Sequence, residues 1–251
     1  MMRTSVVICE DKGAIASRAL ELVVDGLRTG IGRRGEAHLA LTGGSSASAL
    51  FALLGIDPVA RRVDWSRVHV WQGDERFVPL EHPDRNWAGA LAEWLMGGGG
   101  SPATLHPIPI DAALAGGHDA SWAAERYAEE LAATLPSRAG VPSFDVVLLG
   151  MGGDGHILST FPGTPPVIEQ SLPVMPVVAP THIEPHLPRV TLSPFVLRAA
   201  GGIVVMVPGA GKAATVREVL AGAFDPERLP AQLAIRPTAV WLLEPGSASE
   251  L

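Results

Sequence analysis

The residues with the clearest chemical potential in this chain are a histidine and an aspartate in a glycine-rich segment. Asp154 and His156 belong to the stretch GMGGDGH, which follows the apolar run Val146–Leu149. Histidine is the usual general base near neutral pH, and a neighbouring carboxylate can fix its tautomer and orient its ring. A lone histidine is more often structural, but one that four glycines display after a buried strand favours a catalytic role. We therefore interpret His156 as a base and Asp154 as its partner.

The same glycines also satisfy the GxGxxG pattern of dinucleotide-binding proteins. That pattern belongs on the first strand-to-helix turn, where it opens a long helix. Here it lies in the middle of the chain, and Phe161-Pro162-Gly163 ends any following helix within two turns. We therefore exclude a dinucleotide site.

Three consecutive charges, Asp74, Glu75 and Arg76, follow the apolar run Val68–Trp71. Such a cluster inside an apolar frame is unusual for a plain turn, although a solvated charged turn stays open as an alternative. In a parallel sheet, ligands bind beyond the carboxyl ends of the strands. The position of the cluster therefore indicates a binding role.

Two further segments favour a small anion. Gly43, Gly44 and Ser45 follow an apolar run and open a helix, so their backbone N–H groups can approach a phosphate, although a simple glycine turn explains them equally well. Lys212 stands at a helix start, where a cation opposes the helix dipole unless it faces a bound anion. Arg189 is a further cation that opens an apolar stretch.

The overall charge argues against an extended anionic partner. The chain has 251 residues with 19 Lys and Arg against 26 Asp and Glu, a net charge of −7, and only two of the basic residues are lysines. Nucleic-acid binders and proteins of anionic membranes need an extended basic surface, and the negative balance without a run of Lys and Arg argues against one. We expect neither partner, and we also expect no membrane span, no signal peptide and a cytoplasmic location. The single cysteine, Cys9, excludes an internal disulfide framework and a cysteine-rich zinc site.

The elements that must position these residues alternate between strands and helices. This alternation predicts an α/β protein whose mostly parallel sheet has helices on both sides, and residues 1–251 read better as one domain than as two. The proline-rich segment from Pro162 to Pro194 reads as an insertion or a lid. Asp84 or Asn86 and Ser121 are candidate helix N-caps. The predicted strands are Val6–Cys9, His38–Leu41, Val68–Trp71, Val146–Leu149, Gly202–Val207 and Val240–Leu243, and the predicted helices are Gly13–Arg28, Ser46–Leu54, Trp87–Met96, Ala120–Leu135 and Lys212–Ala221.

Taken together, these segments resemble the family of 6-phosphogluconolactonases and glucosamine-6-phosphate isomerases. The resemblance runs through LALTGGSSASAL, VWQGDERFVPLEHPDRN, FDVVLLGMGGDGHILSTFPG, LPRVTL and VPGAGKAATV. It implies a three-layer α/β/α sandwich with a Rossmann-like sheet and hydrolysis of 6-phosphoglucono-1,5-lactone. Three positions depart from the usual family pattern: Ser45-Ser46-Ala47, Ile157-Leu158-Ser159, and Arg85 before the asparagine.

The resemblance also implies roles for individual residues. His156 matches the proposed general base, and Asp154, Asp74 and Glu75 match the acidic positions around the sugar. Gly43, Gly44, Ser45, Arg76, Arg189 and Lys212 match positions that surround the phosphate and the ring. No metal or organic cofactor is needed, because a lactone is already an activated ester. A covalent route through Ser159 is the weaker alternative, since no GxSxG elbow presents it.

Two rival functions stay open. The deaminase relatives carry a glutamate where this chain has Phe161 and a tyrosine where it has Arg76, and a phenylalanine cannot transfer protons. A non-catalytic sugar-phosphate sensor would keep the cations but would not need the Asp154–His156 pair. The sequence leaves the oligomeric state open between monomer and dimer.

Overall fold

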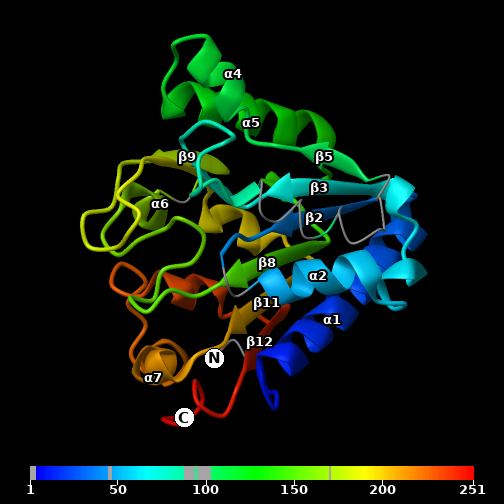
Figure 1. Ribbon diagram of the computed structural model, residues 1–251, viewed down its shortest axis with the longest axis vertical. Coiled ribbons are helices and arrows are strands. Elements are labelled where there is room, and N and C mark those ends of the chain that lie inside the picture. Colours follow the sequence, from blue (N-terminus) through cyan, green and yellow to red (C-terminus); the bar gives the residue numbers. More distant parts are fainter. Residues whose placement is uncertain (1–3, 45–46, 88–93, 95–102, 170) are drawn as a thin grey trace.

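A seven-stranded parallel sheet runs through the centre of the structure (Figure 1). The computed structural model describes residues 4–44, 47–87, 94, 103–169 and 171–251. The strand order is β1-β12-β11-β8-β2-β3-β5, and every neighbouring pair is parallel. The strands are β1 (Ser5–Ile8), β2 (Ala37–Leu41), β3 (Val68–Gln72), β5 (Thr104–His106), β8 (Val146–Gly150), β11 (Gly202–Val207) and β12 (Ala239–Leu243). This confirms the α/β fold class, and the six strands predicted from the sequence all belong to this sheet.

Alternate residues of the central strands face two separate cores, which explains the continuous apolar runs. On β2, Leu39 and Leu41 pack with helices α1 (Lys12–Arg34) and α2 (Ser48–Ile56), whereas Ala40 packs on the opposite face. That second face is covered by α5 (Ala120–Thr134), α7 (Ala213–Ala221) and a small second sheet. Three layers result, with the strands buried between them (Figure 1).

The small sheet refines the interpretation of the proline-rich segment as an insertion or a lid. Its strand order is β4-β10-β9, with β4 at Asp74–Arg76, β9 at Val174–Val177 and β10 at Arg189–Leu192, and both pairings are antiparallel. All four residues of β10 are buried. The segment between Pro162 and Pro194 therefore supplies part of the core. It also contains the short helix α6 (Pro165–Ile168).

The helices begin and end close to the predicted positions, with two corrections. Helix α1 continues beyond Arg28 to Arg34, because Gly30 packs closely on Asp145 instead of ending the helix, and Gly35 (φ 86°) forms the left-handed C-cap. Asp119, not Ser121, caps α5, since its carboxylate accepts the N–H groups of Ser121 and Trp122. Most of the predicted helix Trp87–Met96 lies outside the described residues.

The remaining elements are short. They are α4 (Ile110–Ala115), the hairpin strands β6 (Ser137–Arg138) and β7 (Val141–Pro142), and 3-10 turns at Ala60–Arg62, Trp65–Arg67, Pro194–Arg198, Ala210–Lys212 and Pro230–Ala234. No helix within the described part of the chain is long and apolar enough to cross a membrane.

Three histidines form a ladder across β2, β3 and β5. The ring of His38 stacks on that of His69 with a centroid distance of 4.8 Å, and His69 Nδ1 lies 2.9 Å from His106 Nε2. Trp71 stacks on His106 at 3.8 Å. Burial, followed by the charge of His69, lowers the pKa of His38 to about 4, and burial with the charge of His106 lowers the pKa of His69. Burial therefore favours the neutral imidazole at His38 and His69.

We predict that this ladder makes the fold sensitive to mild acid. An unfolded histidine takes up a proton near its ordinary pKa of about 6.5, whereas folded His38 stays neutral down to about pH 4. The contribution of His38 to stability is therefore complete above pH 6.5 and is lost as the pH falls toward 4, by at most about 1.4 kcal/mol per pH unit. Urea unfolding at pH 7 and pH 5 should show that His38→Gln loses less stability on acidification than the wild type.

The exposed His118 provides the matched control, because His118→Gln should retain the wild-type difference between the two pH values. Equal losses in the wild type and in His38→Gln would show that His38 titrates normally in the folded chain.

Candidate active site

A cavity of about 180 Å³ opens at the carboxyl ends of β2, β3 and β8. Figure 1 shows these three strands pointing toward the same side of the molecule. The cavity is lined by Thr42, Gly43, Gly44, Asp74, Arg76, Asn86, Gly150, Met151, Gly152, His156, Leu158 and Arg189. Segments that are distant in the sequence therefore meet where an open parallel sheet binds its ligands.

The loop after β8 holds Asp154 and His156 in direct contact. His156 Nδ1 lies 2.6 Å from Asp154 Oδ1, and the His156 backbone N–H donates to the same oxygen at 3.2 Å. Gly152 makes this geometry possible, because a Cβ at that position would lie 2.1 Å from His156 Nδ1. Gly155 adopts φ 81° in the turn between the two side chains, a conformation that favours glycine.

The ionisation state of the Asp154 carboxylate determines which nitrogen of His156 carries the proton. Burial acts to raise the pKa of Asp154, but the hydrogen bonds and charge of His156, together with the hydrogen bond of His182, outweigh burial and hold the pKa well below its ordinary value. An ionised carboxylate only accepts hydrogen bonds, so His156 Nδ1 carries the proton of this bond. In the neutral ring, Nε2 then keeps its lone pair, as a general base requires.

Two arginines lie next to each other on adjacent strands of the small sheet. Arg76 on β4 and Arg189 on β10 are direct partners in the antiparallel register. Arg76 Nη1 donates to the Asp84 carbonyl at 2.6 Å, and Arg189 Nη2 donates to the Pro185 carbonyl at 3.2 Å. The Nε atoms of both arginines are buried and have no hydrogen-bond partner among the described residues.

This pairing favours an anion between the two side chains. Like charges directly opposite each other on neighbouring strands are destabilising. Burial lowers the pKa of the Arg189 guanidinium, an effect that Asp74 opposes and Arg76 strengthens. A phosphate or carboxylate at this place would neutralise both cations and accept their remaining N–H groups.

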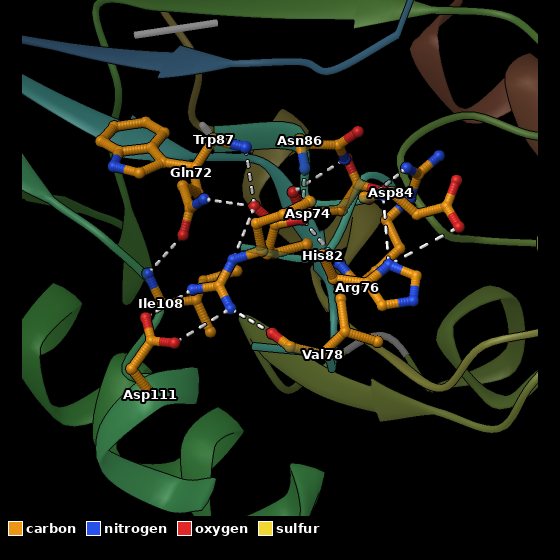
Figure 2. Close-up of polar contacts among 12 residues, drawn as sticks. Gln72, Asp74, Arg76, Val78, His82, Asp84, Asn86, Trp87, Ile108 and Asp111 are labelled. Atoms are coloured by element: carbon orange, nitrogen blue, oxygen red, sulfur yellow. Dashed lines mark hydrogen bonds and ion pairs between the residues drawn. The ribbon is translucent and has the colours of Figure 1, made fainter. Parts of the chain in front are cut away.

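Glu75 organises the same region from within the core. Its fully buried carboxylate accepts the backbone N–H groups of Arg76, Asn86 and Trp87, each at 2.8 Å, and the Gln72 side chain at 2.9 Å. In Figure 2, dashed lines from the labelled Gln72 and Trp87 meet at one carboxylate oxygen. Burial raises the pKa of Glu75, and the three backbone N–H groups oppose that rise. Glu75 does not line the cavity, and its contacts are those of a residue that shapes the cavity wall.

Arg85, one of the departures from the family pattern, completes this network. Its guanidinium is fully buried, with Nε 3.3 Å from Glu75 Oε2 and Nη2 2.9 Å from Asp111 Oδ2. It also donates to the Val78 carbonyl (Figure 2). Arg85 therefore adds a buried cation that supports the Glu75 carboxylate.

Asp74 and Ser159 form a hydrogen bond between two chain segments. Ser159 Oγ donates to Asp74 Oδ2 at 2.5 Å, and the Ser159 backbone N–H donates to Thr191 Oγ1 at 3.1 Å. Ser159 is completely buried, whereas Asp74 lines the cavity. These contacts are those of a residue that positions Asp74, and they do not favour Ser159 as a nucleophile.

The glycine turn after β2 forms another wall. The Asn86 side chain packs on Gly43, where a Cβ would lie 2.3 Å from Asn86 Cγ, and Gly44 has φ 81°. Ser45 lies outside the described residues. Lys212 does not line the cavity itself, but its Nζ donates to the carbonyl of Met151 at 2.7 Å, and Met151 does line it. Burial lowers the pKa of Lys212.

Six of the residues predicted from the sequence therefore line the cavity. Asp154, Glu75 and Lys212 do not line it, but each forms a hydrogen bond with a residue that does. The six are Gly43, Gly44, Asp74, Arg76, His156 and Arg189. His182 is absent from the sequence-based prediction. Its Nε2 lies 2.9 Å from Asp154 Oδ2, but its position in a proline-rich loop, 28 residues after Asp154, gives no local signal. Among the described residues, no group of three or more His, Cys, Asp or Glu side chains is arranged to hold a metal ion.

Comparison with known proteins identifies relatives that align over the whole chain. A 6-phosphogluconolactonase of Streptomyces coelicolor is 36% identical over 259 residues, which cover 98% of this chain and 94% of the relative. The 6-phosphogluconolactonase of Synechocystis sp. is 33% identical and covers 100% of this chain and 99% of its own length.

Solved structures agree with this relationship. The 6-phosphogluconolactonase of Leishmania guyanensis superposes with a TM-score of 0.86 at 30% identity, covering 99% of this chain and 98% of its own. A monomeric glucosamine-6-phosphate deaminase shares the fold, with a TM-score of 0.76 at 18% identity, and covers 98% of this chain and 100% of its own. The family model described as glucosamine-6-phosphate isomerases/6-phosphogluconolactonase matches residues 10–243. The chain belongs to this family.

Proposed function

We propose that this chain hydrolyses 6-phospho-D-glucono-1,5-lactone to 6-phosphogluconate, the second step of the oxidative pentose phosphate pathway. The observation that carries the proposal is the placement of His156 in one cavity with the cross-strand arginines Arg76 and Arg189. A general base and a paired cation site suit a substrate that has an electrophilic carbonyl at one end and a phosphate at the other. The relatives that align over the whole chain carry the name of this activity.

The reaction begins when water attacks the lactone carbonyl carbon and Nε2 of neutral His156 accepts a proton from that water. Such a positioned base contributes about 10²–10⁴-fold to the rate. The carbonyl oxygen becomes an oxyanion, which the backbone N–H groups of the glycine-rich loop stabilise. The tetrahedral intermediate then collapses, the ring C–O bond breaks, and the leaving oxygen takes the proton from the His156 imidazolium.

The phosphate orients the lactone from a distance. Arg76, Arg189 and the Gly43–Gly44 turn hold it, so that the carbonyl lies in front of the base. Lys212 supports the cavity wall through its hydrogen bond to the Met151 carbonyl. Asp154 keeps His156 in the reactive tautomer through the 2.6 Å bond to Nδ1. Residues 1–251 act in this proposal as one domain in the cytoplasm, with a small phosphorylated lactone as the partner and with neither nucleic acid nor membrane.

Amino-sugar deamination is disfavoured by the residue at position 161. Phe161 is completely buried and packs on the His156 ring with a centroid distance of 4.7 Å. It occupies the place of the proton-transferring glutamate in the deaminase relatives and has no titratable group. A non-catalytic sugar-phosphate sensor is also disfavoured, because it would not need the Asp154–His156 pair.

A coupled assay tests the proposal directly. Glucose-6-phosphate dehydrogenase generates the lactone, and the assay asks whether this chain accelerates its disappearance above spontaneous hydrolysis. We expect acceleration. No acceleration, with binding of 6-phosphogluconate intact, would favour the sensor instead.

Replacing the base should affect the chemical step. We predict that His156→Ala lowers kcat by about 10²-fold or more, because a positioned general base is lost, and changes KM by less than about threefold. Steady-state kinetics in the coupled assay measure both. The exposed His118→Gln should retain wild-type kinetics. A His156→Ala variant with near wild-type kcat would remove His156 as the base.

Removing one arginine should instead weaken phosphate recognition. We predict that Arg189→Met raises KM for the phosphorylated lactone by about tenfold or more, which corresponds to about 1.4 kcal/mol. The value of kcat/KM for unphosphorylated glucono-1,5-lactone should change much less, because that substrate has no phosphate to lose. A matched loss for both substrates would show that Arg189 supports the fold and does not read the phosphate, and Arg76→Met provides the second variant.

A further inference from the structure

A second histidine binds the carboxylate that holds the proposed base. His182 lies in the segment between β9 and β10, residues 178–188, which we call the strap. Its Nε2 lies 2.9 Å from Asp154 Oδ2, while His156 Nδ1 lies 2.6 Å from Oδ1. Because the low pKa of Asp154 keeps its carboxylate ionised, both imidazoles donate to it. One carboxylate therefore bridges two histidines that belong to different segments of the chain.

Phe161 packs against both imidazoles. Its ring lies 4.7 Å from that of His156 and 5.8 Å from that of His182, the second contact being edge-to-face at 88°. The Arg189 guanidinium lies over the same ring, 5.1 Å from its centroid. Since Phe161 is completely buried, its ring has a fixed position, and both imidazoles pack against it.

The two oxygens of Asp154 are held in different ways. Oδ1 accepts both the side chain and the backbone N–H of His156, and these donors move together with the loop. Oδ2 accepts His182, its one hydrogen-bond donor among the described residues. Rotation of a carboxylate about its terminal torsion is soft, so donors at Oδ1 alone leave its plane poorly defined. A donor at Oδ2 from a separate segment defines that plane.

We propose that His182 is a positioning residue: it fixes the plane of the Asp154 carboxylate, so that Asp154 holds His156 with Nε2 directed into the cavity. Its kinetic consequence rests on the proposed function. His182 acts through Asp154 and does not itself touch the reacting atoms. Because its side chain is about half exposed, its loss leaves the core intact.

Kinetics of strap variants test this role. We predict that His182→Ala lowers kcat for the phosphorylated lactone about tenfold, with KM changed by less than about twofold. His182→Gln should recover most of kcat, because its amide N–H can donate to the same carboxylate oxygen. The exposed Glu184→Gln, in the same strap, should behave as the wild type. Wild-type kcat in His182→Ala, or a rise in KM alone, would overturn the proposal.

A double-mutant cycle separates action through Asp154 from an independent role. In an Asp154→Ala background, His182→Ala should cause no further loss of kcat, since the group through which it acts is already gone. An equal tenfold loss in both backgrounds would show that His182 works by another route and would overturn the proposal.

A spectroscopic readout is independent of turnover. The Nδ1 proton of His156, in a short bond to a carboxylate, should give a downfield proton NMR signal in the wild-type chain. This signal should weaken or broaden in His182→Ala and return in His182→Gln, and an unchanged signal in His182→Ala would overturn the proposal. A wild-type chain without lactonase activity would overturn the proposed function alone, because this signal is measured without substrate.

Discussion

The direct pairing of Arg76 with Arg189 is the constraint on which the site depends. Their strands, β4 and β10, lie 113 positions apart in the chain and meet only in the small antiparallel sheet. Two guanidinium groups at one register position repel each other, and the buried Nε atoms of both are without hydrogen-bond partners among the described residues. The sheet therefore holds an arrangement that an anion stabilises. Binding of a phosphate to the folded chain alone would add to its stability by mass action.

Burial decides which carboxylates shape the site and which act in it. Glu75 is completely buried and receives three backbone N–H groups, so its hydrogen bonds fix the chain from Arg76 to Trp87. Asp154 lies behind the cavity wall, in contact with His156, and the hydrogen bonds of two imidazoles keep it ionised. A carboxylate whose oxygens already accept several backbone N–H groups has little acceptor capacity left to bind a ligand. A carboxylate that accepts hydrogen bonds from two side chains, as Asp154 does, can instead hold a base in a defined orientation.

The alternation of apolar runs and helical periods was enough to predict six of the seven strands of the central sheet and the segments that meet at its edge. Strands covered on both faces are easily recognised, because β8 is apolar throughout and β2 is apolar apart from His38. Strand β5 is short, and β9 contains a proline, so neither gives that signal. Glu75 could be predicted as part of a charged cluster, but its inward direction depends on the β3–β4 turn. The contact between His182 and Asp154 depends on the path of the strap, which no local pattern encodes.

Phe161 shows why one residue at this position cannot suit both lactone hydrolysis and amino-sugar deamination. Its ring supports His156 and His182 and lies under the Arg189 guanidinium. A glutamate in the same buried place would need a cation as its partner, and the Arg189 guanidinium lies 5.1 Å from the centroid of the Phe161 ring. That ion pair would draw Arg189 away from an anion in the cavity and would take the aromatic surface from both histidines. A phenylalanine leaves the arginine available and the base supported, which suits hydrolysis of a phosphorylated lactone.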